Sequence, residues 1–451
     1  MTNYDAIVIG AGQPGPGVAG SLAGEGKRVA VIELDRVGGT CLNHGCKPTK
    51  ALRASAAVAH QARRAADYGV HTGEVTVDFP AAVHRVHSMI DKMRQSVIDY
   101  LEGTDGVDLI YGQAELRART DGPHEVTVDG TKHTAPAVYL NLGARASVPP
   151  LPGIDTVDYL TEVELLALTE LPQHMIVVGG GYIGLEFGQM FRRFGSNITL
   201  VAGGGIAPRE DEDVQAILTD TFTDEGVVIV RAKTQSVQPH PDGVEVTLDD
   251  GSTLKGSHLL MATGRKSNID LIGDQHGLEL DDHGFIKING RFETSVDGVW
   301  ALGDINGHGA FTHTAYQDGQ ILLDHDRSVD DRITAYAMFT DPPLGRVGMT
   351  EREARASGRH VLKAEVPMSS VSRAIIEDET VGVMRILVDA DTEEFLGATI
   401  LGLGGDDLCQ IIGFAMQAGV KYPVIRDALP IHPTMAEYIP SILNSLQPLE
   451  G

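Results

Sequence analysis

The chain has 451 residues, too many for one hydrophobic core, so we expect two or three domains. Apolar residues make up 42% and charged residues 22%, as in an ordinary globular enzyme, and the formal net charge is -26. This excess of acid argues against a nucleic-acid partner, because phosphate binding is built from surplus Lys and Arg. We attribute the charge to an acid-rich host and not to a charged substrate.

No stretch approaches the roughly 20 apolar residues that cross a bilayer, and the N-terminus has no signal-peptide pattern. With only three cysteines, the chain is also not a secreted disulfide scaffold. We therefore expect a cytoplasmic protein with no membrane partner.

A dinucleotide-binding pattern opens the chain. A short β-branched strand over residues 4–10 runs into a Gly-x-Gly-x-x-Gly turn of Gly10, Gly12 and Gly15, and the next strand ends on Glu33. Such glycines let backbone N–H groups approach a pyrophosphate at a helix N-terminus, and the acid can accept bonds from a ribose. The pattern predicts a first dinucleotide site here.

Two cysteines follow this motif, Cys41 and Cys46, with four residues between them. A helix that starts at Cys46, with Pro48 in its first turn, would stabilise a thiolate. A static disulfide is disfavoured because so short a loop adds little constraint, and zinc is disfavoured because no second Cys or Cys/His pair lies nearby. We expect a redox-active pair and no metal site, whereas Cys409, alone in an apolar stretch, is expected in the core.

Farther along, apolar residues at helical spacing over 88–101 predict a scaffold helix. A second glycine turn then appears at Gly179, Gly181 and Gly184, and its following strand, over 197–201, ends in Ala202 and three glycines instead of an acid. The missing acid would not repel a ribose 2'-phosphate, which favours NADPH, although no Arg stands at the same place and Arg209 lies farther on.

The rest of the chain adds three glycine-containing strand exits, at 142–145, 262–265 and 300–304, and the last of these offers Asp304 to a polyhydroxylated cofactor. Strands over 382–388 and 395–401 precede a helix over 407–418. These elements predict an α+β module whose apolar surface pairs two subunits.

Taken with the string His432-Pro-Thr-Met-Ala-Glu437, these motifs resemble the flavoprotein disulfide reductases, the family of glutathione reductase, dihydrolipoamide dehydrogenase and mercuric ion reductase. The resemblance covers nearly the whole chain. It implies an α/β fold with two Rossmann-like dinucleotide-binding domains, for FAD and NAD(P), plus a C-terminal α+β dimerisation domain. The implied domains are 1–148 and 265–332 for FAD, 149–264 for NAD(P), and 333–451 for an obligate homodimer.

The resemblance also implies roles for single residues. Cys46 would be the thiol that faces the flavin in a charge-transfer contact, and Cys41 the outer, interchange thiol. His432 and Glu437 would be the acid-base pair, supplied by the partner subunit so that each active site spans two chains.

Further residues are expected to contact the cofactors. Lys50 and Glu186 would lie as partners beside the flavin, and Tyr182 would cover the nicotinamide pocket or simply pack at a helix start. The remaining predicted cofactor contacts are Gly10, Gly12, Gly15, Glu33, Gly39, Thr40, Ala114, Gly143, Gly179, Gly181, Gly184, Gly264, Arg265, Gly303 and Asp304.

The redox loop departs from the family pattern at His44 and Lys47, where apolar or small side chains are more common. Lys47 could lower a thiol pKa, meet an anionic substrate or be a solvated surface lysine. The first helix, over 17–26, lacks the basic residues that would bind glutathione carboxylates, and the chain ends without the cysteine pair of many mercuric reductases. Glutathione and mercury are therefore not the expected substrates.

The leading prediction is an NAD(P)H-dependent enzyme that passes hydride through FAD to the Cys41–Cys46 disulfide and on to a low-molecular-weight disulfide. One alternative is a metal-ion or quinone reductase that uses mainly the flavin. Another is a subunit of a larger assembly, as dihydrolipoamide dehydrogenase is, or a redox-responsive binding protein.

Overall fold

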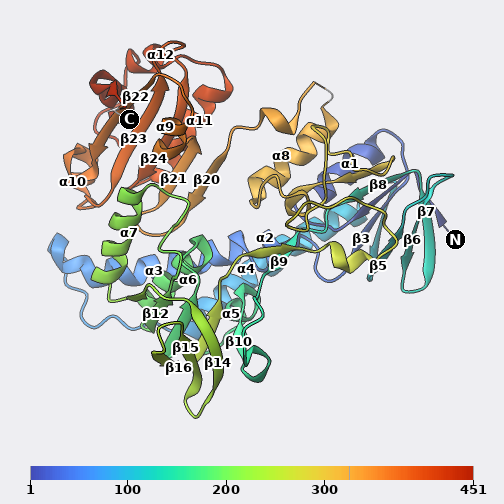
Figure 1. The fold of residues 1–451 in the computed structure, drawn as a ribbon, viewed down its shortest axis with the longest axis horizontal. Coiled ribbons are helices and arrows are strands. Elements are labelled where there is room, and N and C mark those ends of the chain that lie inside the picture. The colour runs from blue at the N-terminus through green and yellow to red at the C-terminus, as the bar shows by residue number, and fades with distance from the viewer. Residues whose placement is uncertain (1, 325, 450–451) are drawn as a thin grey trace. The chain divides into compact units, whose positions relative to one another are not determined.

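The computed structural model describes residues 2–324 and 326–449. The chain forms two compact units, which we describe separately (Figure 1). Unit 1 consists of Met1–Pro149, Leu160–Leu171 and Thr263–Arg332, and unit 2 of Pro150–Tyr159, Pro172–Ala262 and Ile333–Gly451.

A parallel sheet organises unit 1. Its strands pair in the order β19-β8-β2-β3-β4, with bounds Val299–Ala301, Ala137–Leu140, Ala6–Ile9, Val29–Glu33 and Val107–Tyr111. The central strands β2 and β3 are buried along their whole length, as their continuous β-branched sequences predict. Their carboxyl ends carry Gly10 and Glu33, which brings both residues to one edge of the sheet.

Helices and a smaller sheet complete unit 1. The helices are α1 (Gly15–Gly24), α2 (Gly39–Asn43), α3 (Cys46–Arg64), α4 (Phe79–Glu102), α5 (Glu162–Leu166) and α8 (Thr312–Leu323). The smaller sheet has the order β1-β7-β6-β5, with bounds Thr2–Asn3, Thr131–Ala135, His124–Val128 and Ala114–Arg117. Strands β9 (Ala144–Ala146) and β18 (Arg265–Ser267) pair antiparallel.

Unit 2 contains a second parallel sheet. Its strands pair in the order β17-β11-β12-β13, with bounds His258–Met261, His174–Val178, Asn197–Val201 and Val228–Val230; β10 (Tyr159–Leu160) lies at the sequence boundary between the units. The helices α6 (Tyr182–Phe194) and α7 (Glu212–Asp224) follow β11 and β12. An antiparallel sheet of β14 (Thr234–His240), β15 (Gly243–Leu248) and β16 (Thr253–Gly256) extends this region.

The C-terminal part of unit 2 is a six-stranded antiparallel sheet in the order β20-β21-β24-β23-β22-β25. Its strands are Ala335–Met338, Leu344–Gly348, Phe395–Leu401, Val383–Asp389, Val361–Pro367 and Gln447–Pro448. Around it lie α9 (Glu351–Ala356), α10 (Ser372–Ile376), α11 (Gly405–Gln417), α12 (Tyr422–Arg426) and α13 (Tyr438–Ile442). Cys409 on α11 is buried in the core of this part, as predicted.

The predicted fold class is confirmed: the chain has two parallel nucleotide-type sheets, one in each unit, and an α+β C-terminal part in unit 2. The helix expected over 88–101 is longer and begins at Phe79, because the Asp78 side chain accepts a hydrogen bond from the Ala81 amide and caps it. The domain boundaries at 148, 264 and 332 stay predictions.

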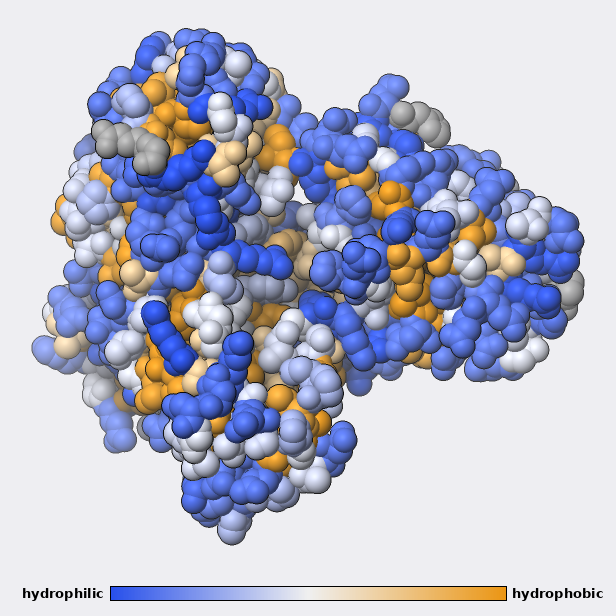
Figure 2. All heavy atoms as spheres, viewed as in Figure 1, coloured by the Kyte–Doolittle hydropathy of each residue, from blue (hydrophilic) through white to orange (hydrophobic). Residues whose placement is uncertain are grey.

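The surface is largely hydrophilic, with apolar patches between the polar side chains on the face that Figure 2 shows. Phe414, Leu429 and Ile431 in the C-terminal part are strongly exposed apolar residues, with exposed fractions of 70%, 96% and 79%. Within the part of the chain that the structure describes, every helix is too short or too polar to cross a membrane.

Candidate active site

The first glycine turn leaves its backbone open to a ligand. Gly10 has φ +104, and a Cβ atom there would lie 2.2 Å from the Asn141 carbonyl oxygen. A Cβ on Gly15 would lie 2.5 Å from the Gly10 carbonyl oxygen, and one on Gly39 would lie 2.7 Å from the Gly12 Cα. Only glycine fits these positions, and the resulting close backbone packing suits a pyrophosphate beside the start of α1.

Glu33 is held at the end of β3 by two backbone amides. Its carboxylate accepts hydrogen bonds from Ala11 N, at 2.9 Å, and from Asp35 N, at 3.0 Å. Burial raises the pKa of this carboxyl group above its usual value, although the amides oppose that shift. A buried, oriented carboxylate at this place suits the ribose hydroxyls of FAD.

The redox loop is shaped by one buried asparagine. The Asn43 side-chain amide donates to the carbonyl oxygens of Arg36, Val37 and Gly39, at 3.0 to 3.2 Å, and fixes the turn of α2. Helix α3 then begins at Cys46, as the sequence predicted.

The two cysteines of the loop are not joined by a disulfide in this structure. Cys46 is exposed, and its sulfur lies 3.1 Å from the Thr312 hydroxyl oxygen at the start of α8. Cys41 is half-buried, and its hydrogen bond to Cys46, together with burial, raises the pKa of the Cys41 thiol above its ordinary range. The Cys41 thiol therefore keeps its proton more readily than an ordinary cysteine does and can donate it to the Cys46 sulfur.

Asp304 lies in a buried cluster of charged side chains in unit 1. Burial raises the pKa of the Asp304 carboxyl group, while Arg265, at 3.8 Å, opposes the shift. The Arg265 guanidinium also donates to Glu162, at 2.9 Å. Arg265 and Asp304, which were both predicted as cofactor contacts, thus lie beside each other, and Glu162 is a neighbour that the sequence did not indicate.

Several predicted contacts have simpler surroundings. Gly143 and Gly264 adopt φ +67 and +116 with open space where a Cβ would stand, whereas Gly303, at φ +74, donates its amide to the buried Asp318. Ala114 is a buried residue of β5. Thr40 lies on α2 and Lys50 on α3, in the same loop and helix as the cysteines.

His44 of the redox loop is half-buried, and burial lowers the pKa of its imidazole below its usual value. Lys47 is exposed on the first turn of α3. The roles of His44 and Lys47 stay predictions.

The second glycine turn, in unit 2, repeats the geometry of the first. A Cβ on Gly179 would lie 2.2 Å from the Ala262 carbonyl oxygen, and one on Gly184 would lie 2.2 Å from the Gly179 carbonyl oxygen. Gly181 precedes α6, whose first residue is Tyr182. These glycines again fit a dinucleotide phosphate.

Glu186 on α6 is buried, and its carboxylate accepts a hydrogen bond from Phe339 N, at 2.9 Å. Its neighbour Gln189 donates to the Asp341 carbonyl oxygen, at 2.7 Å. These hydrogen bonds fix α6 to the segment that contains Phe339 and Asp341 within unit 2. The predicted pairing of Glu186 with Lys50 joins the two units and stays a prediction.

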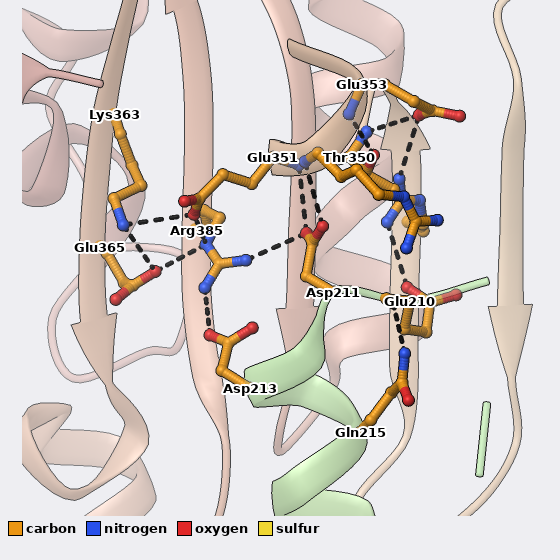
Figure 3. Close-up of polar contacts among 12 residues, drawn as sticks. Glu210, Asp211, Asp213, Gln215, Thr350, Glu351, Glu353, Lys363, Glu365 and Arg385 are labelled. Atoms are coloured by element: carbon orange, nitrogen blue, oxygen red, sulfur yellow. Dashed lines mark hydrogen bonds and ion pairs between the residues drawn. The ribbon is translucent and has the colours of Figure 1, made fainter. Parts of the chain in front are cut away.

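A buried ion network follows β12 (Figure 3). The Arg385 guanidinium, 2% exposed, binds Asp211 at 3.1 Å and Glu365 at 2.6 Å, and also contacts Asp213. Asp211 additionally accepts the amides of Glu351 and Arg352, both at 3.1 Å, at the start of α9. The chain after β12 is thereby anchored to the C-terminal sheet of the same unit.

A second buried arginine repeats this arrangement beside the first. Arg346 binds Glu210, at 3.1 Å, and Glu210 also accepts a hydrogen bond from the Tyr336 hydroxyl. Burial is the main cause that raises the pKa of Tyr336 well above its usual range.

His432 and Glu437 form the predicted pair. The His432 Nδ1 atom lies 2.8 Å from a Glu437 carboxylate oxygen; the glutamate is buried, whereas the imidazole side chain is 75% exposed. The Thr434 hydroxyl accepts the Glu437 amide, at 3.2 Å, and holds this turn. With Nδ1 directed to the carboxylate, Nε2 is the nitrogen that remains for a substrate thiol.

Comparison with known proteins agrees with this geometry. Residues 4–319 match the family model described as pyridine nucleotide-disulphide oxidoreductase, and residues 334–442 match its dimerisation domain. The chain belongs to this family. It is 34% identical to the probable pyridine nucleotide-disulfide oxidoreductase RclA of Escherichia coli, over 98% of this chain and 99% of that protein, and 30% identical to the mercuric reductase of Streptomyces lividans, over 97% and 94%.

A solved structure supports the family assignment. The Cu(II) complex of the HOCl-induced flavoprotein disulfide reductase RclA from E. coli matches with a TM-score of 0.89 and 33% identity, over 99% of this chain and all of that one. As a member of the pyridine nucleotide-disulphide oxidoreductases, the chain is an oxidoreductase that uses FAD and NAD(P)H.

Sequence reasoning missed three groups of the site: Asn141 against the first glycine turn, Thr312 beside Cys46 and Glu162 beside Arg265. Each of these contacts joins residues far apart in the sequence, so none of them had a local signal. Among the described residues, the structure shows no group of three or more His, Cys, Asp or Glu side chains arranged to hold a metal ion.

Proposed function

We propose that this flavoprotein uses Cys41 and Cys46 to reduce a low-molecular-weight disulfide with electrons from NAD(P)H. The observation that carries the proposal is the pair of reduced cysteines, Cys41 on α2 and Cys46 at the start of α3, in which Cys41 hydrogen-bonds to Cys46 and the Thr312 hydroxyl lies 3.1 Å from the Cys46 sulfur. FAD, when bound, takes hydride from NAD(P)H and delivers the electron pair to the oxidised Cys41–Cys46 pair.

The thiols then reduce the substrate in two exchanges. Cys41, as a thiolate, attacks one substrate sulfur and forms a mixed disulfide, and the first substrate thiol leaves. Cys46 attacks the Cys41 sulfur, the second substrate thiol leaves, and the Cys41–Cys46 disulfide forms. The sum is one disulfide reduced to two thiols at the expense of one reduced nicotinamide and one proton.

His432 supplies the proton steps in this proposal. Its Nε2 atom protonates each leaving thiolate and accepts the proton of Cys41, while Glu437 holds Nδ1 at 2.8 Å. The dimerisation domain supports an obligate homodimer, and we propose that the partner subunit's His432 serves each thiol pair. Because the reaction requires reduced cysteines and NAD(P)H, we place the enzyme in the cytoplasm.

The test is an anaerobic titration of the FAD-loaded enzyme with NADPH and with NADH, followed by a panel of small disulfides. We expect a long-wavelength absorption band on reduction and turnover with at least one disulfide. If Cys41→Ser turns over disulfides as fast as the unchanged enzyme, the thiol pathway is wrong.

A second candidate is reduction of a thiophilic metal ion, Cu(II) first. It is favoured by the similarity to RclA, solved in complex with Cu(II), and to mercuric reductases. Two Cu(II) ions would be reduced to Cu(I) as the two thiols become a disulfide and release two protons. No thiolate leaves, so His432 is not needed to protonate one.

The variant His432→Ala separates these candidates. Disulfide reduction should fall by about a hundredfold to ten-thousandfold when the acid-base group is lost. Metal-ion reduction should keep most of its rate. If neither acceptor is sensitive to loss of the thiols, a flavin-only quinone reductase is the remaining alternative.

A further inference from the structure

We infer that Lys233 is the residue that selects NADPH, by binding the 2'-phosphate from the segment that follows β13 and not from the end of β12 itself. The inference rests on the proposed function, because it concerns the coenzyme of the same hydride transfer. In nucleotide folds of this kind, an acid at the end of the second strand binds the ribose 2'-hydroxyl of NAD, and a nearby cation accommodates the 2'-phosphate of NADP.

The end of β12 offers neither group. Ala202 is buried there, and the exposed Gly203 and Gly204 follow. Gly205 adopts φ +85, and its amide donates to the Ala202 carbonyl oxygen at 2.9 Å, which closes a tight turn. The loop therefore leaves space for a phosphate but provides no side chain to bind one.

Lys233 supplies a cation from the segment that follows the neighbouring strand β13. Strand β13 runs parallel to β12, so the residues after both strands lie at one edge of the sheet. A Cβ on Gly203 would lie 2.7 Å from the Lys233 Cγ atom and 3.0 Å from the Ala232 carbonyl oxygen. The lysine stem therefore lies directly over Gly203, in the place where a side chain of the β12 loop would otherwise stand.

The lysine is fixed at its backbone and exposed at its side chain. Its amide donates to the Asp249 carboxylate at 3.0 Å, and its carbonyl oxygen accepts the Asp249 amide at 2.9 Å. Lys233 is an exposed residue, and Arg231, two positions earlier, is exposed as well. A second cation next to the first strengthens the positive potential at this edge.

Arg209 is the competing cation, because it lies on the loop after β12. Its carbonyl oxygen accepts a bond from Arg352 at 3.2 Å, and the next residue, Glu210, is buried in the ion pair with Arg346. The loop is thus bound at Arg209 to α9 and at Glu210 to strand β21 of the C-terminal sheet, several residues after the glycines. Lys233, in contrast, contacts the glycine segment itself.

The experiment measures dissociation constants of 2',5'-ADP and 5'-AMP on the FAD-loaded enzyme by calorimetry, with kcat/KM for NADPH and NADH as a second readout. The unchanged enzyme should bind 2',5'-ADP about tenfold or more tightly than 5'-AMP. Lys233→Ala should remove most of that ratio without changing 5'-AMP affinity, and Lys233→Glu should reverse it. Lys255→Ala, an exposed lysine of the same unit on β16, is the matched control and should keep the ratio.

Two results would overturn the inference: a ratio that survives in Lys233→Ala, or one that is lost in Arg209→Ala while Lys233→Ala retains it. Ala202→Glu should shift the preference to NADH, as an acid at the end of β12 would repel the 2'-phosphate. The nucleotide affinities need no electron acceptor. They report on Lys233 even if no disulfide proves to be a substrate, so failure of the proposed function is seen separately.

Discussion

The two nucleotide folds share one frame and differ in the segment after their second strand. After β3 the chain carries Glu33, oriented by two amides, and continues into the helices that hold Cys41 and Cys46. After β12 it carries Ala202 and glycines, and then Asp211, which is buried against Arg385. The glycine turns are alike in the two folds. The segment after the second strand differs: in the first fold it leads to the cysteine pair, and in the second fold a buried ion pair holds it to the C-terminal sheet.

Removing the reactive sulfur after β3 should have the largest effect. Cys46→Ser should lower disulfide turnover about a thousandfold or more, because the nucleophile that resolves the mixed disulfide is lost. Flavin reduction by NADPH, followed by stopped-flow absorbance, should persist. Cys409→Ala, which removes the buried thiol of unit 2, should retain turnover, and equal losses in both variants would contradict the assignment.

Removing Arg385, which holds the chain after β12 to the C-terminal sheet, should lower the stability of unit 2 without weakening FAD binding. Arg385→Leu leaves several carboxylates facing one another and should lower the free energy of unfolding of unit 2 by about 3–5 kcal/mol. Denaturant titration followed by far-UV circular dichroism measures this loss, and flavin absorbance shows whether FAD stays bound. Arg355→Leu, which removes an exposed ion pair with Glu351, should cost under about 1 kcal/mol.

Glu33 offers a test on the first fold alone. Glu33→Ala should weaken FAD binding about tenfold or more, because the ribose loses an acceptor. The dissociation constant of FAD, measured by flavin fluorescence, gives the effect. Loss of NADPH affinity instead would mean that the two sites were assigned in the wrong order.

The same carboxyl group predicts a pH effect. Burial raises its pKa in the folded flavin-free protein, so the folded state holds the proton more tightly than the unfolded state does. Its contribution to stability is therefore present below the ordinary glutamate pKa and is lost as pH rises through the folded value. Glu33→Gln does not titrate there, so the stability difference between the two proteins should change in that window, as thermal melts across pH would show.

The smallest expected effect comes from removing the hydroxyl group next to the Cys46 sulfur. Thr312→Val removes a hydroxyl that lies 3.1 Å from the Cys46 sulfur. The long-wavelength absorption band of the reduced enzyme should then appear at higher pH, with turnover lowered only severalfold. Thr312→Ser, which keeps the hydroxyl, should restore the original pH dependence; if it does not, the hydrogen bond is not the cause.

The sequence was sufficient for the local features. Strand β12 has the predicted bounds, and α3 begins at Cys46, because these elements follow from strand pattern, glycine spacing and helix-start chemistry. The helix α4 was predicted too short, although Asp78 before Phe-Pro was a readable cap.

The sequence could not show contacts between distant parts of the chain. Thr312 reaches Cys46 across 266 positions, and Arg385 reaches Asp211 across 174. Neither spacing has a local period, and each contact depends on how sheets and helices pack. The charged cluster around Asp304 was found only in part for the same reason, since Glu162 lies 103 positions before Arg265.

Asp211 and Arg385 have a consequence for a chain with 62 acidic and 36 basic side chains. Their exposed fractions are 8% and 2%, so dissolved ions screen the attraction between them much less than the attraction between exposed charges. Concentrated salt weakens attraction between solvated charges but leaves this enclosed contact intact. We therefore expect this ion pair, which connects the segment after the nucleotide sheet to the C-terminal sheet of unit 2, to be about equally stable at low and at high salt concentration.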